Sequence, residues 1–384
     1  MIDPAIPGLE RALDRDYVGA CVERVLGLES GWTVIGCEFE KVRYRRGQRA
    51  LVQFRVTGRG EEERQWLVAG SLHSGKDGRG VAAKLARLAI APAPGLRSMQ
   101  GFDPGTEMVL SVFPADRGLP GLVEFAKGRR VLGFRPEEAS VARYRIGLSA
   151  TLEVPAGFLK FHPSGGARRS HSVGLDLSRI AGVDVRLATP DRLDATVEAT
   201  FVRRSPGTPL DQSGRAIEAA AGALAVLHRA RWDVGVPRRE RPRRRAHRAA
   251  SWIRTVLPPA SGLLAEIMSR PDPPGPSSVV HGDLKPEHVL VAPDGSVTFI
   301  DLDSAGVGRP LSDIASLYTR IEDEGARAAL IESYDRSAGP VDWSGFATEV
   351  GLASVSWALF HAQRRRGGWQ DAVLSTLELS RQVS

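Results

Sequence analysis

The chain has 384 residues, of which 42% are hydrophobic, and a formal net charge of +7 at pH 7. This length suits two or three globular domains, and no stretch approaches the ~18 uninterrupted apolar residues of a membrane helix. The acidic start Met1–Ala5 lacks the basic-then-apolar order of a signal peptide. Cys21 and Cys37 are too few for a disulfide framework. We therefore expect a globular protein of the reducing cytoplasm without a membrane partner.

An internal repeat fills the amino-terminal part of the sequence, at an offset of about 90 residues. Each copy indicates a strand, a polar turn and a second strand, followed by a third strand and a glycine-rich basic segment. Val52, Phe54 and Val56 alternate with polar residues, which is typical of a sheet with one buried face. These elements lie at 42–56, 66–73 and 75–80 in the first copy and at 132–146, 156–162 and 165–169 in the second. The repeat predicts two similar antiparallel sheets.

Helical patterns replace the strands from about residue 211. Before them, 197–202 and 206–210 indicate an edge strand and a connector between two lobes. His228 closes the first helix, and we expect it to be a packed or capping residue rather than a ligand. The helices are predicted at 217–228, 252–268, 312–336, 342–366 and 368–382.

Much of the excess positive charge lies in one arginine tract, Arg238–Arg248. Such a tract could bind nucleic acid or an anionic surface. The alternative is a solvated loop or helix start. The alternative is favoured because the tract has no interleaved aromatic residues for base stacking, and we do not expect a nucleic-acid partner.

Two acidic centres, Asp283 and Asp301, lie eighteen residues apart, each at the end of an apolar run. Between them, 289–291 and 297–300 flank the turn Pro293–Ser296, which predicts a hairpin. A hairpin of this length can return both carboxylates to one end of a sheet. A base and a metal ligand for phosphoryl transfer need this arrangement.

The segment His281–His288, followed by Ile300–Asp303, resembles the catalytic and metal-binding loops of the aminoglycoside phosphotransferase/choline kinase family, relatives of the protein kinases. The family pattern is H-G-D-x-x-x-x-N, a strand pair, and then I-D-x-D/E. Gly308–Ala315 resembles the family's G-x-P-x-x-D-L-A. The resemblance covers residues from about 130 to 384 and is strongest over 279–315. It implies an α+β, bilobal, protein-kinase-like fold with an antiparallel-sheet amino lobe and a mostly helical carboxyl lobe.

The resemblance implies a role for each matching residue of these loops. Asp283 would accept or orient the acceptor hydroxyl, and Lys285 would add charge at the γ-phosphate. Asp301, with Asp303 near it, would hold Mg²⁺, or Mn²⁺ as the alternative. His281 and Asp313 would be structural. The implied reaction transfers phosphate from ATP or GTP to a hydroxyl of a small molecule, such as an aminoglycoside-like antibiotic, a sugar or an amino alcohol.

Lys160, on the third strand of the second repeat, matches the lysine that holds the nucleotide phosphates in a kinase-like amino lobe. The aligned residue of the first repeat is Ser71. We therefore expect residues 129–207 to be the nucleotide lobe, 208–384 the helical catalytic lobe, and 1–128 an extra, degenerate copy that serves as a cap. In a rival assignment the first copy is the nucleotide lobe, with Lys76 or Lys84 as the phosphate lysine. In another, both copies are plain sheets and Lys160 is a surface residue.

His288 stands where the family has asparagine, five residues after the catalytic aspartate. An imidazole nitrogen is a poor substitute for an amide oxygen on Mg²⁺. Either the second metal is absent or a softer ion such as Mn²⁺ occupies the site. Alternatively, His288 bonds Asp283 or a phosphate, or the chain binds nucleotide without efficient catalysis. The retained acids favour an active enzyme.

Two other function classes stay open. H-x-D-L-K-P is shared with serine/threonine protein kinases, but the metal loop is not D-F-G and no activation segment follows it. A binding module built on the arginine tract and the duplicated sheet leaves the acidic motif unexplained. Four acidic residues of the carboxyl lobe indicate either a site for a cationic acceptor or, as favoured, a solvated helix face. They are Glu322, Asp323, Glu324 and Glu332.

Overall fold

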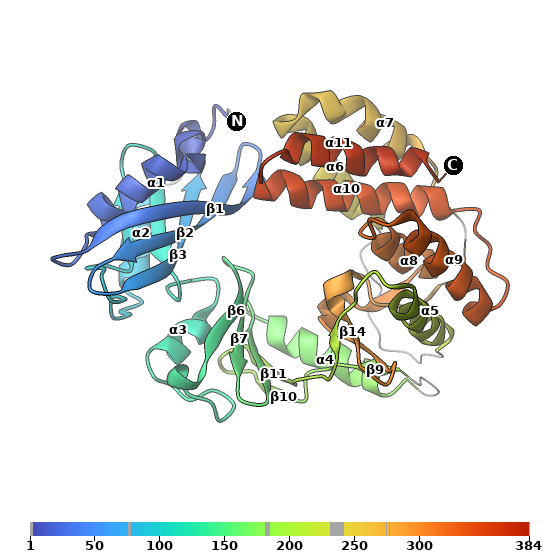
Figure 1. Cartoon of the computed structure of the whole chain (residues 1–384). Helices are drawn as coiled ribbons and strands as arrows, with labels where there is room; N and C mark the ends of the chain where they lie inside the picture. The colour runs from blue at the N-terminus through green and yellow to red at the C-terminus, as the bar shows by residue number, and fades with distance from the viewer. Residues whose placement is uncertain are drawn as a thin grey trace.

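The computed structural model describes residues 3–75, 78–180, 185–230, 242–273, 275 and 277–383. Two five-stranded antiparallel sheets fill the amino-terminal half, and helices dominate the remainder (Figure 1). The predicted α+β architecture with an extra sheet is confirmed. Within the described residues, no helix combines the length and apolar character needed to cross a bilayer.

The first sheet has the strand order β1-β2-β3-β5-β4. Its strands are β1 (Thr33–Arg45), β2 (Arg49–Arg59), β3 (Glu63–His73), β4 (Gln100–Asp103) and β5 (Met108–Val112). Helix α1 (Arg15–Cys21) precedes it, and α2 (Gly78–Ala86) follows β3. Fully buried side chains on β2 and β3, among them Phe54 and Leu72, form its packed face.

The second sheet repeats this plan in the order β6-β7-β8-β11-β10. Its strands are β6 (Ser140–Arg145), β7 (Ser149–Val154), β8 (Gly157–Phe161), β10 (Arg192–Asp194) and β11 (Ala199–Arg203), and α4 (Gly166–Ser178) follows β8 as α2 follows β3. The predicted repeat is therefore a real duplication of topology. The expected edge strand is wrong, because β11 lies between β10 and β8.

The first hairpin of each sheet corrects the repeat's register. Tyr44 pairs with Ala50 and Tyr144 with Ala150, so the hairpins stand 100 residues apart, not about 90. In each copy the tyrosine hydroxyl and the turn glycine's N–H donate to one buried aspartate. In the first sheet, Tyr44 and Gly47 donate to Asp3 at 2.6 and 2.8 Å. In the second, Tyr144 and Gly147 donate to Asp116 at 3.0 and 2.6 Å. Both glycines have positive φ, which a turn of this kind requires.

The helices after the second sheet are more numerous than predicted, because two of the predicted helices are each divided in two. They are α5 (Gly214–Arg229), α6 (Pro242–Val256), α7 (Ser261–Ser269), α8 (Pro310–Tyr318), α9 (Glu324–Ala338), α10 (Phe346–Arg364) and α11 (Trp369–Glu378). The single helix predicted at 252–268 is wrong because Pro258 and Pro259 separate α6 from α7. The helix predicted at 312–336 is also two, because Asp323 caps a new start by accepting from the Ala326 N–H at 2.7 Å.

Three hydrophobic cores hold these elements together. The first sheet shares one core with α6, α7, α10 and α11, and β1 reaches α10 at the top of Figure 1. A second core joins α5, α8 and α9 to the short strands of the motif region. The third lies under the second sheet and includes α3 (Pro120–Ala126). The boundary at residue 128 stays a prediction, because the core that contains α3 includes Leu51 and Ala69 of the first sheet as well as the second sheet.

Four short strands place the two acidic loops. The predicted hairpin is β14 (Val289–Val291) and β15 (Val297–Phe299), flanked by β12 (Thr208–Pro209) and β9 (Arg186–Leu187). A separate pair, β13 (Ser278–Val280) and β16 (Gly306–Gly308), leads into the first loop and out of the second. The loop ends therefore lie together, as the hairpin spacing predicted.

Candidate active site

Lys160 joins the second sheet to the metal loop. Leu159 and Phe161 are buried in the core on one face of β8, so the alternation of the strand turns Lys160 to the other face. Its ammonium group lies 2.8 Å from an oxygen of Asp301 and 2.5 Å from one of Asp303. Burial alone would lower the pKa of Lys160, but the two carboxylates raise it. The predicted phosphate lysine and metal ligands thus meet in one place.

The metal loop holds Asp301 in an unusual backbone conformation. Its φ and ψ are 58° and 50°, in the left-handed region that aspartate tolerates better than most residues. Conformations of this kind cluster at functional sites. Burial alone would raise the pKa of Asp301, but Lys160 and His288 lower it well below its ordinary value. Ser170 of α4 donates to Asp303 at 2.7 Å, so the helix after β8 also holds this loop.

Asp313 organises the loop that carries Asp283. This fully buried carboxylate accepts from the backbone N–H groups of His281 (2.6 Å) and Gly282 (2.9 Å). His228 lies 3.3 Å from it and is buried beside Tyr334. The side chain of His281 bonds the Ile300 carbonyl at 2.8 Å, which ties the catalytic loop to the metal loop. Asp313, His228 and His281 therefore stand in structural positions.

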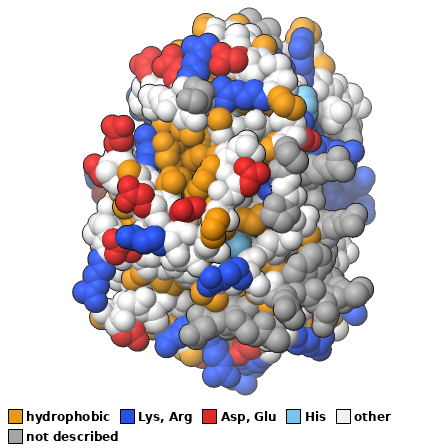
Figure 2. Space-filling model, turned by 90° about the vertical axis from the view of Figure 1, so that its right-hand side faces the viewer, with side chains coloured by type: hydrophobic (Ala, Val, Ile, Leu, Met, Phe, Trp, Pro, Cys, Tyr) orange, Lys and Arg blue, Asp and Glu red, His pale blue; other side chains and the backbone are white. Residues whose placement is uncertain are grey.

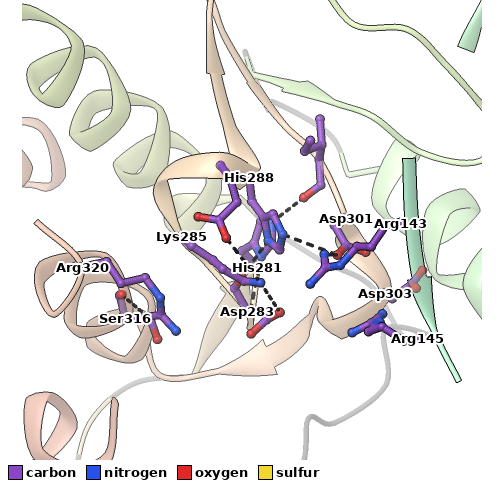
Figure 3. Close-up of polar contacts among 12 residues, drawn as sticks. Arg143, Arg145, His281, Asp283, Lys285, His288, Asp301, Asp303, Ser316 and Arg320 are labelled. Atoms are coloured by element: carbon purple, nitrogen blue, oxygen red, sulfur yellow. Dashed lines mark hydrogen bonds and ion pairs between the residues drawn. The ribbon is translucent and has the colours of Figure 1, made fainter. Parts of the chain in front are cut away.

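Asp283 lies among cations (Figure 3). Arg245 of α6 is 3.1 Å from one carboxylate oxygen and Lys285 is 3.5 Å from the other. Burial alone would raise the pKa of Asp283, but Arg245, Lys285, His288 and Arg320 lower it well below its ordinary range. Asp283 is therefore ionised at neutral pH and can accept a hydrogen bond from a hydroxyl.

His288 contacts both acidic loops. Its Nδ1 lies 2.9 Å from the carbonyl oxygen of Asp283, and its Nε2 lies 3.5 Å from Asp301. A carbonyl only accepts, so Nδ1 carries the proton. Burial lowers the pKa of His288 to about 4, so the ring is neutral at pH 7. Its Nε2 then directs a lone pair toward a carboxylate oxygen.

These residues fit a divalent cation. The Lys160 ammonium group sits between two carboxylates, and an imidazole lone pair faces one of them without a proton to share. Asp301, Asp303 and His288 would hold the ion, which would supply positive charge for the phosphates of a nucleotide. No preformed cluster of three His, Cys, Asp or Glu ligands exists in the part of the chain that the structure describes.

Two cavities meet at these loops. One of about 460 Å³ is lined by Lys160, Asp301, Asp303 and the connector from Val202 to Pro209. Its apolar walls and volume suit a planar ring with a polar tail. The other, of about 1030 Å³, is lined by Asp283 and Lys285. Arg143 and Arg145 of β6 line both cavities.

Sequence reasoning missed two arginines of the site. Arg245 belongs to the arginine tract, and Arg320 follows α8; both line the larger cavity with Asp283. No local motif marks either residue. The described part of the tract is the start of α6, as the favoured alternative predicted, and Arg244, Arg245 and Arg248 are exposed. Arg243 bonds Asp272 and the Met268 carbonyl. Residues 238–241 of the tract lie outside the described residues, as does Lys76.

The acidic residues of the carboxyl lobe lie outside the linings of these two cavities. None of Glu322, Asp323, Glu324 and Glu332 lines either cavity, and Asp323 caps α9. The face of the helical lobe in Figure 2 carries Asp and Glu side chains interspersed with Lys and Arg. Lys84, the rival phosphate lysine, lies exposed on α2 and lines neither cavity.

Several known proteins resemble this chain. Residues 158–347 match the model of the phosphotransferase enzyme family (APH). The uncharacterized protein YcbJ of Bacillus subtilis (strain 168) is 42% identical over 69 residues, or 18% of this chain, and the chain spans 22% of that relative's length.

Two solved structures are also similar. A choline/ethanolamine kinase family protein from Mesorhizobium loti is 14% identical, with a TM-score of 0.47, over 64% of this chain and 88% of that one. The macrolide 2′-phosphotransferase MphH from Brachybacterium faecium is 18% identical, with a TM-score of 0.44, over 63% and 92%.

The family match begins one residue after the start of β8, so it includes Lys160, and it extends past both acidic loops. It therefore covers every residue to which the motifs assign a role. The family predicted from those motifs is confirmed. Residues 158–347 of this chain belong to the phosphotransferase enzyme family.

Proposed function

We propose that this protein transfers the γ-phosphoryl group of ATP or GTP to a hydroxyl of a small molecule. The observation that carries the proposal is the meeting of Lys160 with Asp301 and Asp303 beside Asp283, where the two cavities join. The nucleotide would lie in the smaller cavity, with its base against the connector and its phosphates at Lys160. The acceptor would lie in the larger cavity.

The chain's residues would divide the work of phosphoryl transfer. Asp283 orients the acceptor hydroxyl and takes its proton late, because its low pKa makes it a weak base. Lys285 and Lys160 would offset the negative charge of the phosphates, and a divalent cation held by Asp301 would add further positive charge there. Since α8 begins at Pro310, directly after β16, little room exists for the peptide platform of a protein kinase.

The test combines a nucleotide screen with two matched variants. ATP and GTP, each with Mg²⁺ or Mn²⁺, should raise the melting temperature, and mass spectrometry should detect phosphorylated product from a panel of hydroxyl compounds. Asp283→Asn should lower the transfer rate by ~10²–10⁴-fold while nucleotide binding persists. Asp294→Asn is the control, because Asp294 is exposed at the far turn of the same hairpin.

Two outcomes would contradict the proposal. Full transfer by Asp283→Asn would remove Asp283 from its role. Nucleotide binding without turnover of any acceptor, or of water, would favour the alternative of a nucleotide-binding protein that has lost its chemistry.

A further inference from the structure

The larger cavity lies between three parts of the protein that are far apart in the sequence. The strands β1 and β2 form one wall, β6 and the following turn form another, and α10 forms a third. Asp283 and Lys285 lie where these walls meet the catalytic loop. If the proposed function is correct, the acceptor must enter here, so the chemistry of these walls selects it.

The walls are strongly basic. Twelve Lys and Arg side chains line the cavity, against three carboxylates: Glu38, Glu40 and Asp283. Two of these carboxylates already have partners, since Glu40 pairs with Arg55 at 2.7 Å and Asp283 pairs with Arg245 at 3.1 Å. Three more cations pair with carboxylates outside the lining: Arg15, Arg143 and Lys285. Among the described residues, no ion pair is formed by Lys41, Arg43, Arg145, Arg320 or Arg364 of the lining.

The first sheet contributes two of these unbalanced cations. Lys41 and Arg43 of β1 donate to the backbone carbonyls of Tyr144 and Ile146, at 2.9 and 2.7 Å. A carbonyl is neutral, and neither side chain forms an ion pair within the residues the structure describes. Desolvated cations without counter-charges are costly, so a bound anion would lower the free energy of this site.

The electrostatics of Lys41 agree with this description. Burial lowers the pKa of Lys41 to about 8; Glu40 opposes the shift, while Arg145 and Arg364 add to it. Burial also lowers the pKa of Arg43 to about 10, and Arg49 and Arg145 add to that shift. The cations of β1, β6 and α10 are thus close enough to repel one another.

The opposite wall combines a cation with aromatic surface. Arg320 lies 4.8 Å from the ring centre of Trp357, which stacks on Phe360 at 4.4 Å. The buried Nε of Arg320 has no hydrogen-bond partner among the described residues. Figure 3 shows Arg320 on one side of Asp283 and Arg143 and Arg145 on the other.

The nucleotide does not account for this charge. Its phosphates would meet Lys160, and Arg143 and Arg145 lie at the junction of the two cavities. Lys41, Arg43 and Arg364 line only the larger cavity. A cationic acceptor would meet like charges there, and such juxtapositions oppose binding.

We propose that the acceptor is anionic: a small hydroxyl compound that also carries a phosphate or carboxylate group. Lys41 and Arg43 from the first sheet and Arg364 from α10 bind the anionic group, while Asp283 meets the hydroxyl. The inference rests on the proposed function and narrows it, because aminoglycosides and amino alcohols no longer fit. It also gives the extra sheet a purpose, since two of the three selecting residues come from β1.

The test measures binding to the wild-type protein by calorimetry, without nucleotide. Phosphate compounds (glucose 6-phosphate, glycerol 3-phosphate) and carboxylate compounds (glucuronate, glycerate) are compared with the neutral parents glucose and glycerol. Glucosamine and 3-amino-1,2-propanediol are the cationic members. At least one phosphate or carboxylate compound should bind about tenfold or more tightly than its neutral parent, and the amines should bind more weakly than either.

Variants then assign the preference to the named residues. The double variant Lys41→Met/Arg43→Gln should bind the anionic compound and its neutral parent with affinities within about threefold of each other. Arg46→Gln should keep the wild-type ratio of these affinities, because Arg46 is exposed at the turn of the same hairpin. If the double variant does not fold, Arg364→Gln tests the same prediction from α10. Tighter binding of neutral or cationic compounds, no binding of any anion, or a preference retained in the variants would overturn the proposal.

The same preparations separate this inference from the proposed function. Anion binding without phosphoryl transfer from any nucleotide would defeat the function and leave the anionic site standing. Transfer to a neutral or cationic acceptor would defeat the anionic site and leave the function standing.

Discussion

The two five-stranded sheets share a backbone plan but differ in what they face. Each fastens its first hairpin with one aspartate, and each has a glycine where a short helix meets the backbone of a later turn. A Cβ on Gly8 would lie 2.2 Å from the Thr106 carbonyl oxygen, and one on Gly121 would lie 1.6 Å from that of Val197. The hairpin aspartate and the closely packed glycine occur in both copies because the shared backbone arrangement requires them.

The difference lies on the outward face of the third strand. The sheet registers place Ser71 between Leu51 and Val109, and Lys160 between the corresponding Thr151 and Thr200. Ser71 and Lys160 are thus equivalent positions. The second sheet turns its lysine to the metal loop, whereas the first shares a core with the carboxyl-terminal helices. Under the proposed function, one duplicated unit would hold the nucleotide, while the other forms a wall of the second cavity.

Replacing one core phenylalanine in each sheet should have the largest effect and should show whether the two sheets have separate roles. Phe54 and Phe161 are fully buried, so replacement of either by alanine should lower the free energy of unfolding by ~3–5 kcal/mol. Phe161→Ala, one residue from Lys160, should also abolish the nucleotide-induced rise in melting temperature. Phe54→Ala should retain that rise and lose the preference for anions.

Urea unfolding gives the stabilities, and thermal shifts with nucleotide and with glucuronate give the two binding functions. Equal loss of nucleotide binding in both variants would mean that the sheets do not act separately.

Removing or moving a lysine tests whether only the second sheet supplies the phosphate lysine. Lys160→Met should reduce transfer by ~10²–10³-fold, the usual effect of removing one charge that stabilises the transition state. Lys84→Met should change it little, because Lys84 is exposed on α2. Adding Ser71→Lys to Lys160→Met should not rescue transfer, since the first sheet does not face the metal loop. Initial rates against nucleotide concentration provide the measurement, and rescue by Ser71→Lys would refute the assignment.

The acidic loops and Lys160 were predictable because each is encoded within a few residues of sequence. The hairpin between Asp283 and Asp301 needs only its own turn residues, and β8 needs only the alternation of its side chains. Arg245, Arg320 and Lys41 were not predictable, because packing between distant helices and strands brings them to the cavity. The repeat's offset was wrong in the first hairpin because insertions between strands change the offset along each copy.

The two divided helices show that local signals can also interrupt a longer pattern. Pro258 and the cap at Asp323 are local signals, and they outweigh a hydrophobic period that continues through them. A pattern-based prediction therefore needs both the period and its interruptions.

His288 should set the preference for the metal ion. Because its Nε2 lone pair faces Asp301, the wild-type protein should bind nucleotide more tightly with Mn²⁺ than with Mg²⁺. His288→Asn supplies an amide oxygen and should shift the ratio of the two affinities toward Mg²⁺ by about tenfold. Calorimetric titration of nucleotide with each ion measures this ratio. His247→Asn, an exposed position on α6, is the control; an unchanged ratio in His288→Asn would place His288 outside the metal site.

The smallest expected effect is the pH dependence of anion binding. Lys41 has its pKa lowered from the ordinary 10.5 to about 8, so it is charged at pH 7 and largely neutral at pH 9. A bound anion favours the charged form, so the affinity for glucuronate should be full below pH 8 and fall several-fold between pH 8 and 9. Three arginines lie near Lys41 and add to the downward shift of its pKa: Arg145, Arg364 and Arg143. Glu40 opposes that shift, and arginine side chains do not titrate in this pH range.

Lys41→Arg isolates this one titration, because arginine keeps its charge at pH 9. The variant should bind glucuronate with an affinity that varies little from pH 7 to pH 9, measured by calorimetry in buffers of matched ionic strength. Glucuronate is the suitable probe because its carboxylate does not titrate in this range, whereas a phosphate group has a second pKa of about 6. An equal fall in Lys41→Arg would assign the pH dependence to another group, and the first sheet would then have no demonstrated part in holding the anion.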